Sequence, residues 1–143
     1  MATEVVELGP EDAGEYLRLY REYEWWADRE HADVEHALAH TPLAVGLREN
    51  DELVAAARVL TDFVYYAKVY DVIVAEARRG DGLGKRLMRG IVDRPRLSEV
   101  DVIELRCREG LIHFYEACGF AEHDPTIEVD DREEALVKMN YDT

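Results

Sequence analysis

The chain has 143 residues, of which 48% are hydrophobic and 34% charged, and its formal net charge is −15. This length and composition suit one soluble globular domain and exclude a disordered chain. The surplus of 32 acidic over 17 basic residues excludes a general binder of nucleic acid or anionic membranes. No apolar run approaches the ~20 residues that span a bilayer, and the first residues do not have the build of a signal peptide, so we expect a cytoplasmic location.

The acidic composition resembles that of proteins from extreme halophiles, in which molar salt screens surface repulsion over a Debye length of ~3 Å. An ordinary acidic bacterial protein would have the same composition, so both sources stay open. The two cysteines, Cys107 and Cys118, form no CxxC pair and no disulfide framework, and we expect reduced thiols.

Strand and helix patterns follow one another in the order β-α-α-β-β-β-α-β-α-β-β. Gly9-Pro10 closes the first strand, and apolar residues then recur at helical spacing from Glu11 to Tyr23. Asp33 is expected to cap a second short helix that runs through His40, and Asn50-Asp51 marks a hairpin turn. The other expected elements are strands 3–9, 43–50, 52–60, 63–75, 100–107, 126–129 and 134–140 and helices 83–91 and 110–118. Residues 1–143 are therefore predicted to form a single α/β domain with a mixed sheet.

Charge is unevenly distributed along the chain. Residues 78–108 contain nine basic and five acidic side chains, which makes this segment +4 and the rest of the chain −19. A local cationic region in so acidic a chain indicates an anionic ligand of limited size.

The glycine loop, residues 79–85, lies within this segment between a strand and a helix. The first turn of a helix offers unpaired N–H groups and a partial positive charge, and glycines let a phosphate approach them closely. Arg79, Lys85 and Arg86 would add full positive charges. A P-loop is excluded because Lys85 is followed by arginine instead of a hydroxyl residue, and the glycines do not fit a dinucleotide-binding G-x-G-x-x-G pattern.

The stretch DVIVAEARRGDGLGKRLM, residues 71–88, resembles motif A of the GNAT (GCN5-related N-acetyltransferase) family. Arg79, Gly82 and Gly84 occupy the three defined positions of its Q/R-x-x-G-x-G/A signature. The stretch HFYEACGF resembles a later family motif and supplies Tyr115, Gly119 and Phe120. The resemblance covers nearly the whole chain and implies a mixed central sheet with helices on both faces and a splayed pair of central strands.

The resemblance implies an enzyme that transfers an acetyl group from acetyl-CoA directly to an amine in a ternary complex. The loop amides would hold the pyrophosphate, and a backbone N–H of the preceding strand would polarise the thioester carbonyl. Tyr115 would protonate the leaving thiolate. Arg108 stands where family members often carry asparagine, and it would reach the phosphates of the coenzyme. The implied cofactor-binding residues are Ile73, Val74, Arg79, Gly80, Asp81, Gly82, Leu83, Gly84, Lys85 and Arg108.

No fixed residue of the family takes the proton of the amine. Asp71 is our favoured base because it precedes the proposed oxyanion amides, although a buried carboxylate that accepts neighbouring hydrogen bonds is an equally good interpretation. Other candidates for the acceptor side are Glu24, Asp62, Tyr65, Tyr66 and Glu76. His36 and His40 share a helical face, but no third ligand accompanies them, and we expect no metal.

The acceptor would be a small-molecule or peptide amine, and the acidic composition favours a cationic one. A homodimer is one assembly left open. The rival hypothesis from another class of protein is a non-catalytic acyl-CoA-binding or regulatory domain with the same fold.

Overall fold

The computed structural model describes residues 2–141, and its contacts divide the chain into two compact units. The first unit reaches to Arg108 and the second begins at Glu109. The prediction of a single domain over residues 1–143 stays a prediction. Among the described residues, no helix is long and apolar enough to cross a membrane.

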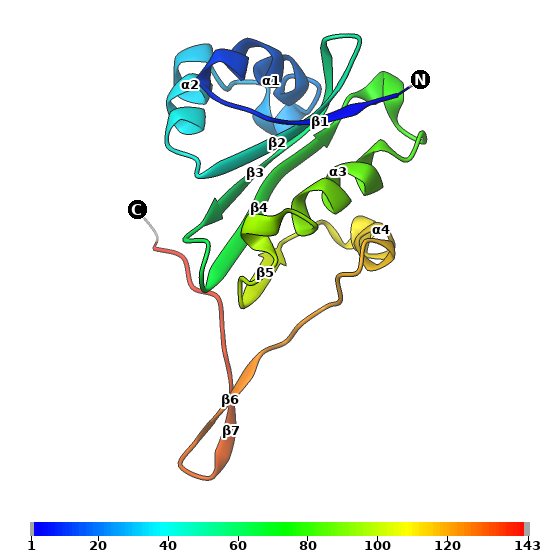
Figure 1. The fold of residues 1–143 in the computed structure, drawn as a ribbon. Coiled ribbons are helices and arrows are strands. Elements are labelled where there is room, and N and C mark those ends of the chain that lie inside the picture. Colours follow the sequence, from blue (N-terminus) through cyan, green and yellow to red (C-terminus); the bar gives the residue numbers. More distant parts are fainter. Residues whose placement is uncertain (1, 142–143) are drawn as a thin grey trace. The chain divides into compact units, whose positions relative to one another are not determined.

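The first unit is built on a five-stranded sheet with the strand order β1-β2-β3-β4-β5 (Figure 1). Its neighbouring strands are antiparallel except for β4 and β5, which are parallel, so the predicted mixed sheet is confirmed. The strands are β1 (Glu4–Glu7), β2 (Leu43–Glu49), β3 (Glu52–Thr61), β4 (Tyr66–Val74) and β5 (Val102–Leu105). The turn between β2 and β3 is made by Asn50 and Asp51, whose positive φ angles of 51° and 65° fit a two-residue hairpin.

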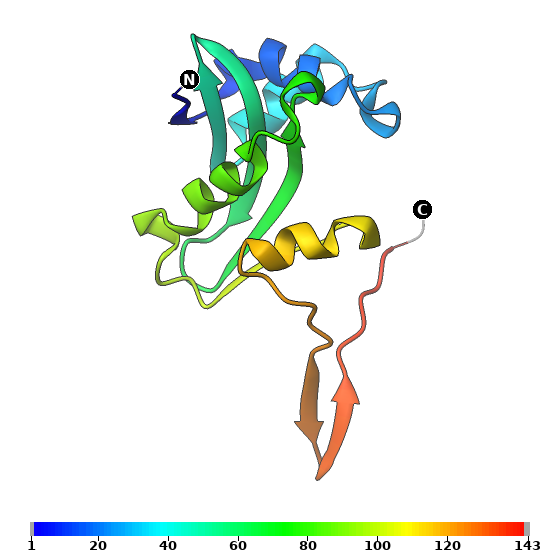
Figure 2. The same ribbon diagram turned by 90° about the vertical axis from the view of Figure 1, so that its right-hand side faces the viewer.

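Helices cover both faces of this sheet, as predicted (Figures 1 and 2). Helices α1 (Ala13–Tyr20) and α2 (His31–Ala39) lie on one face and α3 (Leu83–Val92) on the other. The α1 face buries a cluster that includes Tyr16, Tyr20, Leu53 and Ile73. The buried residues of α3 are Leu83, Leu87, Met88 and Ile91.

The second helix begins earlier than predicted. We expected Asp33 to be its N-cap, whereas α2 starts at His31 and the extended Glu30 is its N-cap. The carbonyl of Glu30 accepts the first helical hydrogen bonds, from the N–H groups of Asp33 and Val34, both at 3.1 Å. No side chain of the described residues caps this end of the helix, so a search for capping side chains does not find its start.

A bulge interrupts the pairing of β3 with β4. Arg58 lies opposite Tyr70, but Ala56 lies opposite Ile73, so β4 contains one extra residue between these pairs. Asp71 occupies the bulge with a φ of 55°, a left-handed conformation that aspartate tolerates better than most residues.

The predicted splay of the two parallel strands begins directly before this bulge. Strand β5 pairs with Tyr66–Val69 only, and the last pair joins Val69 to Leu105. The rest of β4, residues 70–74, has no strand partner on its β5 side among the described residues. An edge of backbone N–H and C=O groups is thus left open inside the sheet.

The second unit contains α4 (Ile112–Ala117) and a hairpin of β6 (Thr126–Val129) and β7 (Arg132–Ala135). Gly119, with a φ of 98°, ends α4 as predicted. The last strand was predicted at residues 134–140, which is wrong. A two-residue turn pairs Val129 directly with Arg132, so pairing starts earlier and ends at Ala135.

Candidate functional site

The glycine loop enters α3 through two glycines in the left-handed region. Gly80 has a φ of 88° and Gly82, the N-cap of α3, a φ of 78°. A Cβ atom added at either glycine would meet no heavy atom within 4 Å, so the space beside the loop is open. The conformation therefore needs glycine, while the open space leaves room for a ligand.

The first turn of α3 presents free donors to this space. Its first helix-forming bond runs from the N–H of Arg86 to the carbonyl of Gly82 at 3.1 Å, which leaves the N–H groups of Leu83, Gly84 and Lys85 without helical acceptors. No side chain caps this end, and its first turn contains no acidic residue. Donors of this kind at the positive end of a helix dipole suit a phosphate or diphosphate.

The basic side chains near the loop have different surroundings. Arg79 donates to the hydroxyl of Tyr23 at 2.7 Å, and its Nε lies 3.3 Å from the carbonyl of Val74. Lys85 is exposed. Arg86, which we expected to add charge at the loop, instead binds the side-chain and main-chain oxygens of Thr3 at 2.5 and 2.6 Å.

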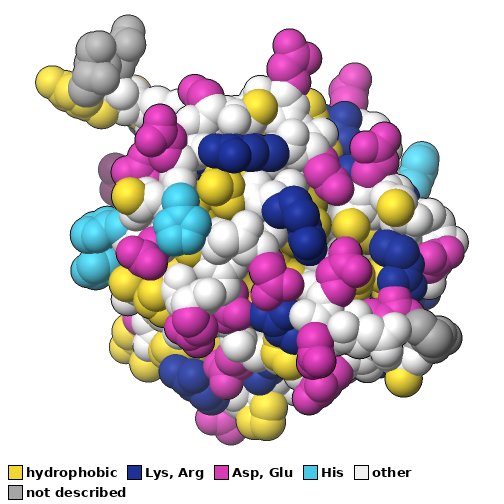
Figure 3. Space-filling model, turned by 90° about the horizontal axis from the view of Figure 1, so that it is seen from above, with side chains coloured by type: hydrophobic (Ala, Val, Ile, Leu, Met, Phe, Trp, Pro, Cys, Tyr) yellow, Lys and Arg dark blue, Asp and Glu magenta, His cyan; other side chains and the backbone are white. Residues whose placement is uncertain are grey.

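Acidic side chains also reach this part of the chain. The carboxylate of Asp81 pairs with Arg78 at 3.2 Å. On the face drawn in Figure 3, Lys and Arg side chains lie among Asp and Glu side chains. Basic and acidic side chains are thus mixed on this face, and the local cationic region indicated by the sequence stays a prediction.

The open edge of β4 distinguishes the backbone N–H groups of Ile73 and Val74, the two candidates for polarising the thioester carbonyl. The N–H of Ala75 donates to the carbonyl of Val54 on β3 at 2.8 Å. Because N–H groups alternate sides along a strand, Ile73 also faces β3, whereas Val74 faces the open side. Of the pair Ile73 and Val74, only Val74 is thus directed to the unpaired edge.

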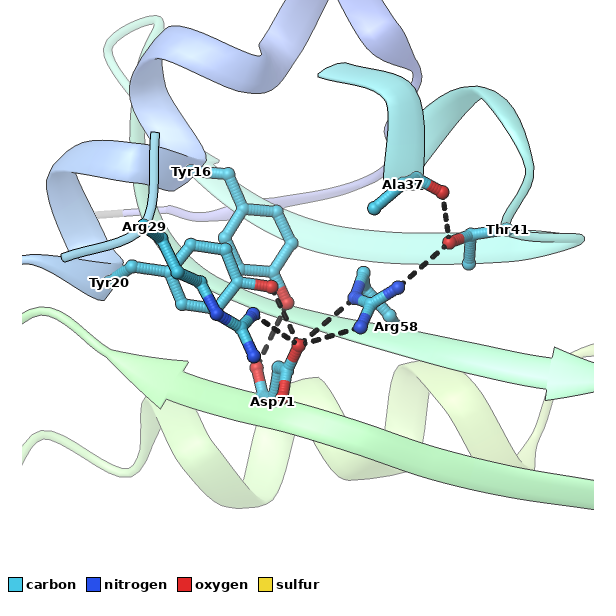
Figure 4. A network of polar contacts seen from close by, with 7 residues as sticks. All are labelled: Tyr16, Tyr20, Arg29, Ala37, Thr41, Arg58 and Asp71. Carbon is cyan, nitrogen blue, oxygen red and sulfur yellow. Dashed lines mark hydrogen bonds and ion pairs between the residues drawn. The ribbon is translucent and has the colours of Figure 1, made fainter. Parts of the chain in front are cut away.

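Asp71 is the centre of a dense polar network (Figure 4). Its Oδ2 accepts hydrogen bonds from the hydroxyl of Tyr20 at 2.7 Å and from Arg29 at 3.1 Å. Arg58 adds two more, from Nε at 3.0 Å and Nη2 at 2.9 Å. The main-chain carbonyl of Asp71 accepts from the hydroxyl of Tyr16 at 2.9 Å, so α1 and β3 together hold the bulge.

This network makes Asp71 a poor general base. Burial alone would raise the pKa of Asp71, but the hydrogen bond from Tyr20 and the charges of Arg58 and Arg29 outweigh it, and the pKa is lowered. A carboxylate stabilised as the anion has little tendency to take a proton. The geometry favours the alternative interpretation of Asp71 as a buried acceptor, with side chains as its donors.

Asp62, another candidate for the acceptor side, has a structural role in the turn before β4. Its Oδ1 accepts the N–H groups of Val64 and Tyr65 at 2.8 Å and of Tyr66 at 3.2 Å. These bonds lower its pKa. The side chains of Tyr65 and Tyr66 are exposed.

The segment between α1 and α2 contacts two arginines, one that follows β4 and one that follows β5. The guanidinium of Arg79, after β4, lies 5.0 Å from the ring centroid of Tyr23. That of Arg108, after β5, lies 5.6 Å from the ring of Trp25, and the two aromatic rings are 5.1 Å apart. The contacts of these aromatic rings with the two arginines were not predicted from the sequence.

Tyr115 belongs to the second unit, on α4. Its ring is buried and contacts Phe114 and Phe120 edge-on, with centroid distances of 4.9 and 6.2 Å. The N–H of Phe120 donates to the carbonyl of Tyr115 at 3.0 Å. The Gly-Phe end of the motif therefore packs against its tyrosine.

His36 of α2 lies beside His40, the residue that follows this helix, without a third ligand among residues 2–141. The ring centroids of His36 and His40 are 4.3 Å apart, and Nδ1 of His40 lies 2.9 Å from the carbonyl of His36. Within residues 2–141, no group of three or more His, Cys, Asp or Glu side chains could hold a metal ion.

An open strand edge that leads through a glycine loop to an uncapped helix end is the coenzyme-binding arrangement expected of an acetyltransferase. Residues 7–120 match the acetyltransferase (GNAT) family, and the chain belongs to this family. It is 33% identical over 104 residues to the uncharacterized N-acetyltransferase ycf52 of Porphyra purpurea. That match covers 70% of this chain and 59% of the relative, so the chain spans little more than half the length of this curated protein.

Solved structures show the same fold. A GNAT-family protein from Xanthomonas campestris pv. campestris has a TM-score of 0.75 and 28% identity, with 86% of this chain and 87% of that chain covered. Glucosamine-6-phosphate N-acetyltransferase from Arabidopsis thaliana has a TM-score of 0.72 and 15% identity, with 90% and 98% covered. The second likeness concerns the fold alone.

Proposed function

We propose that the protein is an acetyl-CoA-dependent N-acetyltransferase that transfers the acetyl group directly to an amine in a ternary complex. The observation that carries the proposal is the open edge of β4, which runs within one unit into the glycine loop and the uncapped N-terminus of α3. The edge supplies donors and acceptors for an extended chain, and the helix end supplies donors for phosphates. The pantetheine arm of the coenzyme is an extended chain that can bind along the edge, and its pyrophosphate can bind at the helix end. The two kinds of group therefore occur in the order that the coenzyme requires.

The chain's own groups have distinct roles in this proposal. The N–H groups of Leu83, Gly84 and Lys85 would bind the pyrophosphate, and Arg79 and Arg108 would add charge. The N–H of Val74 would donate to the thioester carbonyl as negative charge develops on its oxygen. Acetyl-CoA supplies the activated acyl group.

Tyr115 is proposed as the general acid because of its position in the family motif. The new bond joins the amine nitrogen to the carbonyl carbon, the carbon–sulfur bond breaks, and the phenol gives its proton to the sulfur. A phenol with an ordinary pKa of about 10 still carries its proton at pH 7, unlike a carboxylic acid. Because Asp71 is stabilised as an anion, we propose that the amine loses its proton to solvent.

Calorimetry with acetyl-CoA, followed by a free-thiol assay with a panel of amines in low and molar KCl, tests the function. Binding with turnover supports the enzyme, and tight binding without turnover for any amine supports the rival binding domain. Absence of acetyl-CoA binding by the folded protein would overturn both.

Two glycine variants test the loop. Gly82→Ala places a methyl group in the open space and should weaken acetyl-CoA binding about 10-fold or more, a loss of one or two phosphate contacts. Gly119→Ala is the matched control because its φ of 98° and open surroundings give the same strain, of about 1 kcal/mol, at a residue that is not part of the loop. Equal affinities of both variants for acetyl-CoA would remove the phosphate assignment.

Tyr115→Phe tests the acid. It removes one oxygen and keeps the ring, so acetyl-CoA affinity should stay while turnover falls ~10²-fold. The basic limb of the pH profile should also shift, because an ionised phenol cannot donate. Tyr141→Phe, at an exposed tyrosine with no proposed role, is the control. Full activity of Tyr115→Phe with an unchanged profile would exclude this role.

A further inference from the structure

The first unit contains two kinds of arginine–carboxylate cluster, and they differ in their balance of charge. In the Arg48 cluster, one arginine pairs with two carboxylates, Asp12 at 2.6 Å and Glu15 at 2.8 Å. Arg78 likewise contacts two, Glu49 and Asp81. The Asp71 cluster (Asp71, Tyr20, Arg29 and Arg58) reverses this proportion, because two arginines share one carboxylate.

The surplus positive charge of the Asp71 cluster has no counter-charge in the described part of the chain. Within 4.0 Å of the guanidinium groups of Arg29 and Arg58, Asp71 is the only carboxylate among residues 2–141. The side chains of Asp71 and Arg58 are only 9% and 17% exposed, so water screens the cluster weakly. The chain has a net charge of −15, but the side chains of the Asp71 cluster together carry a charge of +1 next to the open edge of β4.

The unused donors of this cluster belong to Arg29. Each nitrogen of the Arg58 guanidinium has an acceptor, since Nε and Nη2 bind Asp71 and Nη1 donates to the Thr41 hydroxyl at 3.2 Å. Arg29 uses only Nη1, and its Nε and Nη2 have no acceptor among residues 2–141. Its side chain is 35% exposed, so these donors are accessible.

Arg29 is also held in place. Its guanidinium carbon lies 4.5 Å from the ring centroid of Tyr20 and 5.5 Å from that of Trp26, while Asp71 fixes one end (Figure 4). An arginine with fixed orientation and free donors binds a carboxylate or phosphate at little entropic cost.

The position of the cluster relates it to the acetyl-transfer site. Asp71 precedes Val74 by three residues on β4, so their Cα atoms are at most about 10 Å apart at ~3.3 Å per residue. A small amine whose nitrogen reaches the thioester can therefore place a second functional group near Arg29.

We propose that Arg29 binds an anionic group of the acceptor, a carboxylate or a phosphate, and so selects small amines that carry one. This proposal rests on the proposed acetyltransferase function. It also reverses the expectation of a cationic acceptor, because the local surplus of charge at Arg29 outweighs the overall acidity of the chain.

Matched pairs of acceptors test the proposal at saturating acetyl-CoA. Each pair differs only in the anion: an amino acid and its amide, or an amino sugar phosphate and the free amino sugar. The wild-type protein should have the higher kcat/KM for the anionic member. The pair that shows the larger ratio identifies carboxylate or phosphate as the preferred anion.

Arg29→Met keeps an unbranched side chain against the aromatic rings but removes the donors. It should lower kcat/KM about 10- to 100-fold for the anionic members and leave the neutral members within about 3-fold. Arg29→Lys keeps the positive charge but loses the planar set of donors. Its kcat/KM for the anionic members should lie between those of the wild type and Arg29→Met. The control is Arg18→Met on α1, whose arginine pairs with Glu52 at 3.7 Å and is 53% exposed.

The outcomes separate the two proposals. Equal losses for both members of every pair, or no wild-type preference, would contradict the role of Arg29. If no amine is turned over, the acetyltransferase proposal fails, and the anion site is then tested with inorganic phosphate in the presence of excess CoA. Phosphate should raise the melting temperature of the wild-type protein more than that of Arg29→Met, and an equal rise in both would exclude the site.

Discussion

The Arg48 cluster and the Asp71 cluster are built from the same chemical groups in opposite proportions. Arg48 ties β2 to the start of α1 through two carboxylates, and all three side chains lie at the rim of the sheet with 14–35% exposure. Asp71 instead gathers two arginines and a tyrosine on one oxygen, at a bulge next to the open edge of β4. Electrostatic pairing is complete in the first cluster and incomplete in the second.

This difference separates a cluster that only holds elements together from one that can also receive a ligand. An arginine that is paired with two carboxylates does not attract a further anion, because their two negative charges already exceed its one positive charge. Two arginines that share one carboxylate keep one positive charge available. The two clusters should therefore respond differently to the loss of a carboxylate.

The largest difference is expected from removing one carboxylate in each cluster. Asp71→Asn leaves the mostly buried Arg58 and the partly exposed Arg29 without a counter-charge and should reduce the free energy of unfolding by about 3 kcal/mol. Asparagine tolerates the φ of 55° at this position, so backbone strain does not add to the loss. Asp12→Asn should lose at most about 1 kcal/mol, because Arg48 keeps Glu15.

Urea denaturation of both variants and the wild-type protein measures this difference. Equal losses of unfolding free energy in Asp71→Asn and Asp12→Asn would show that charge balance does not distinguish the clusters.

Two stacked tyrosines offer a finer comparison within the Asp71 cluster. The rings of Tyr16 and Tyr20 are 4.6 Å apart and both are buried, but Tyr20 donates to the carboxylate and Tyr16 to the main-chain carbonyl of Asp71. Tyr20→Phe should cost about 2 kcal/mol, the usual range for a bond to a charged group, and Tyr16→Phe about 1 kcal/mol. Thermal and urea unfolding should show the larger loss of stability for Tyr20→Phe. A larger loss for Tyr16→Phe would show that the hydrogen bond to the main-chain carbonyl at the bulge stabilises the protein more than the bond to the carboxylate.

Local patterns predicted most of the fold. The order of strands and helices, the hairpin at Asn50-Asp51 and the glycine loop all depend on residues close in sequence, where periodicity and turn chemistry act. The errors at the start of α2 and at β7 arose where a helix begins without a capping side chain and where a turn sets the boundary, which side-chain patterns do not reveal.

The Asp71 cluster could not be predicted in the same way. Tyr20 and Arg29 lie 51 and 42 residues from Asp71 in sequence, and only the packing of α1 and the following segment on the sheet brings them together. Asp71 was selected for its place on the strand, but its partners, and hence its unsuitability as a base, depend on this tertiary packing. The free donors of Arg29 had no sequence signal, because an arginine beside aromatic residues is common on helical surfaces.

Acid should affect the two clusters in the same direction but to different extents. Burial alone would raise the pKa values of Asp71 and Glu15, yet hydrogen bonds and arginine charges lower both. A carboxyl group whose pKa is lower in the folded than in the unfolded state stabilises the protein above its unfolded pKa of about 4, and this contribution is lost as the pH falls through the folded pKa. Stability should therefore fall below about pH 4, and Asp71→Asn should flatten this fall more than Glu15→Gln, because three side chains donate to Asp71.

Melting temperatures measured from pH 6 to pH 3 test this ranking. A wild-type curve that stays level over the range, or a greater flattening in Glu15→Gln, would contradict it.

Salt should give the smallest difference, because it acts on exposed charges more than on buried ones. The net charge of −15 should make the wild-type protein itself gain stability in KCl as surface repulsion is screened, so each variant must be compared with the wild type at the same salt concentration. The penalty of Asp71→Asn should change by only a few tenths of a kcal/mol between dilute buffer and 1 M KCl, since Asp71 is 9% exposed and beyond most ionic screening. The small penalty of Glu15→Gln, whose carboxylate is 35% exposed, should largely disappear over the same range. Urea titrations at both salt concentrations measure these changes. If the penalty of Asp71→Asn were also to vanish in 1 M KCl, solvent would reach its arginines freely, and the surplus charge at Arg29 would be too well screened to select an anionic acceptor.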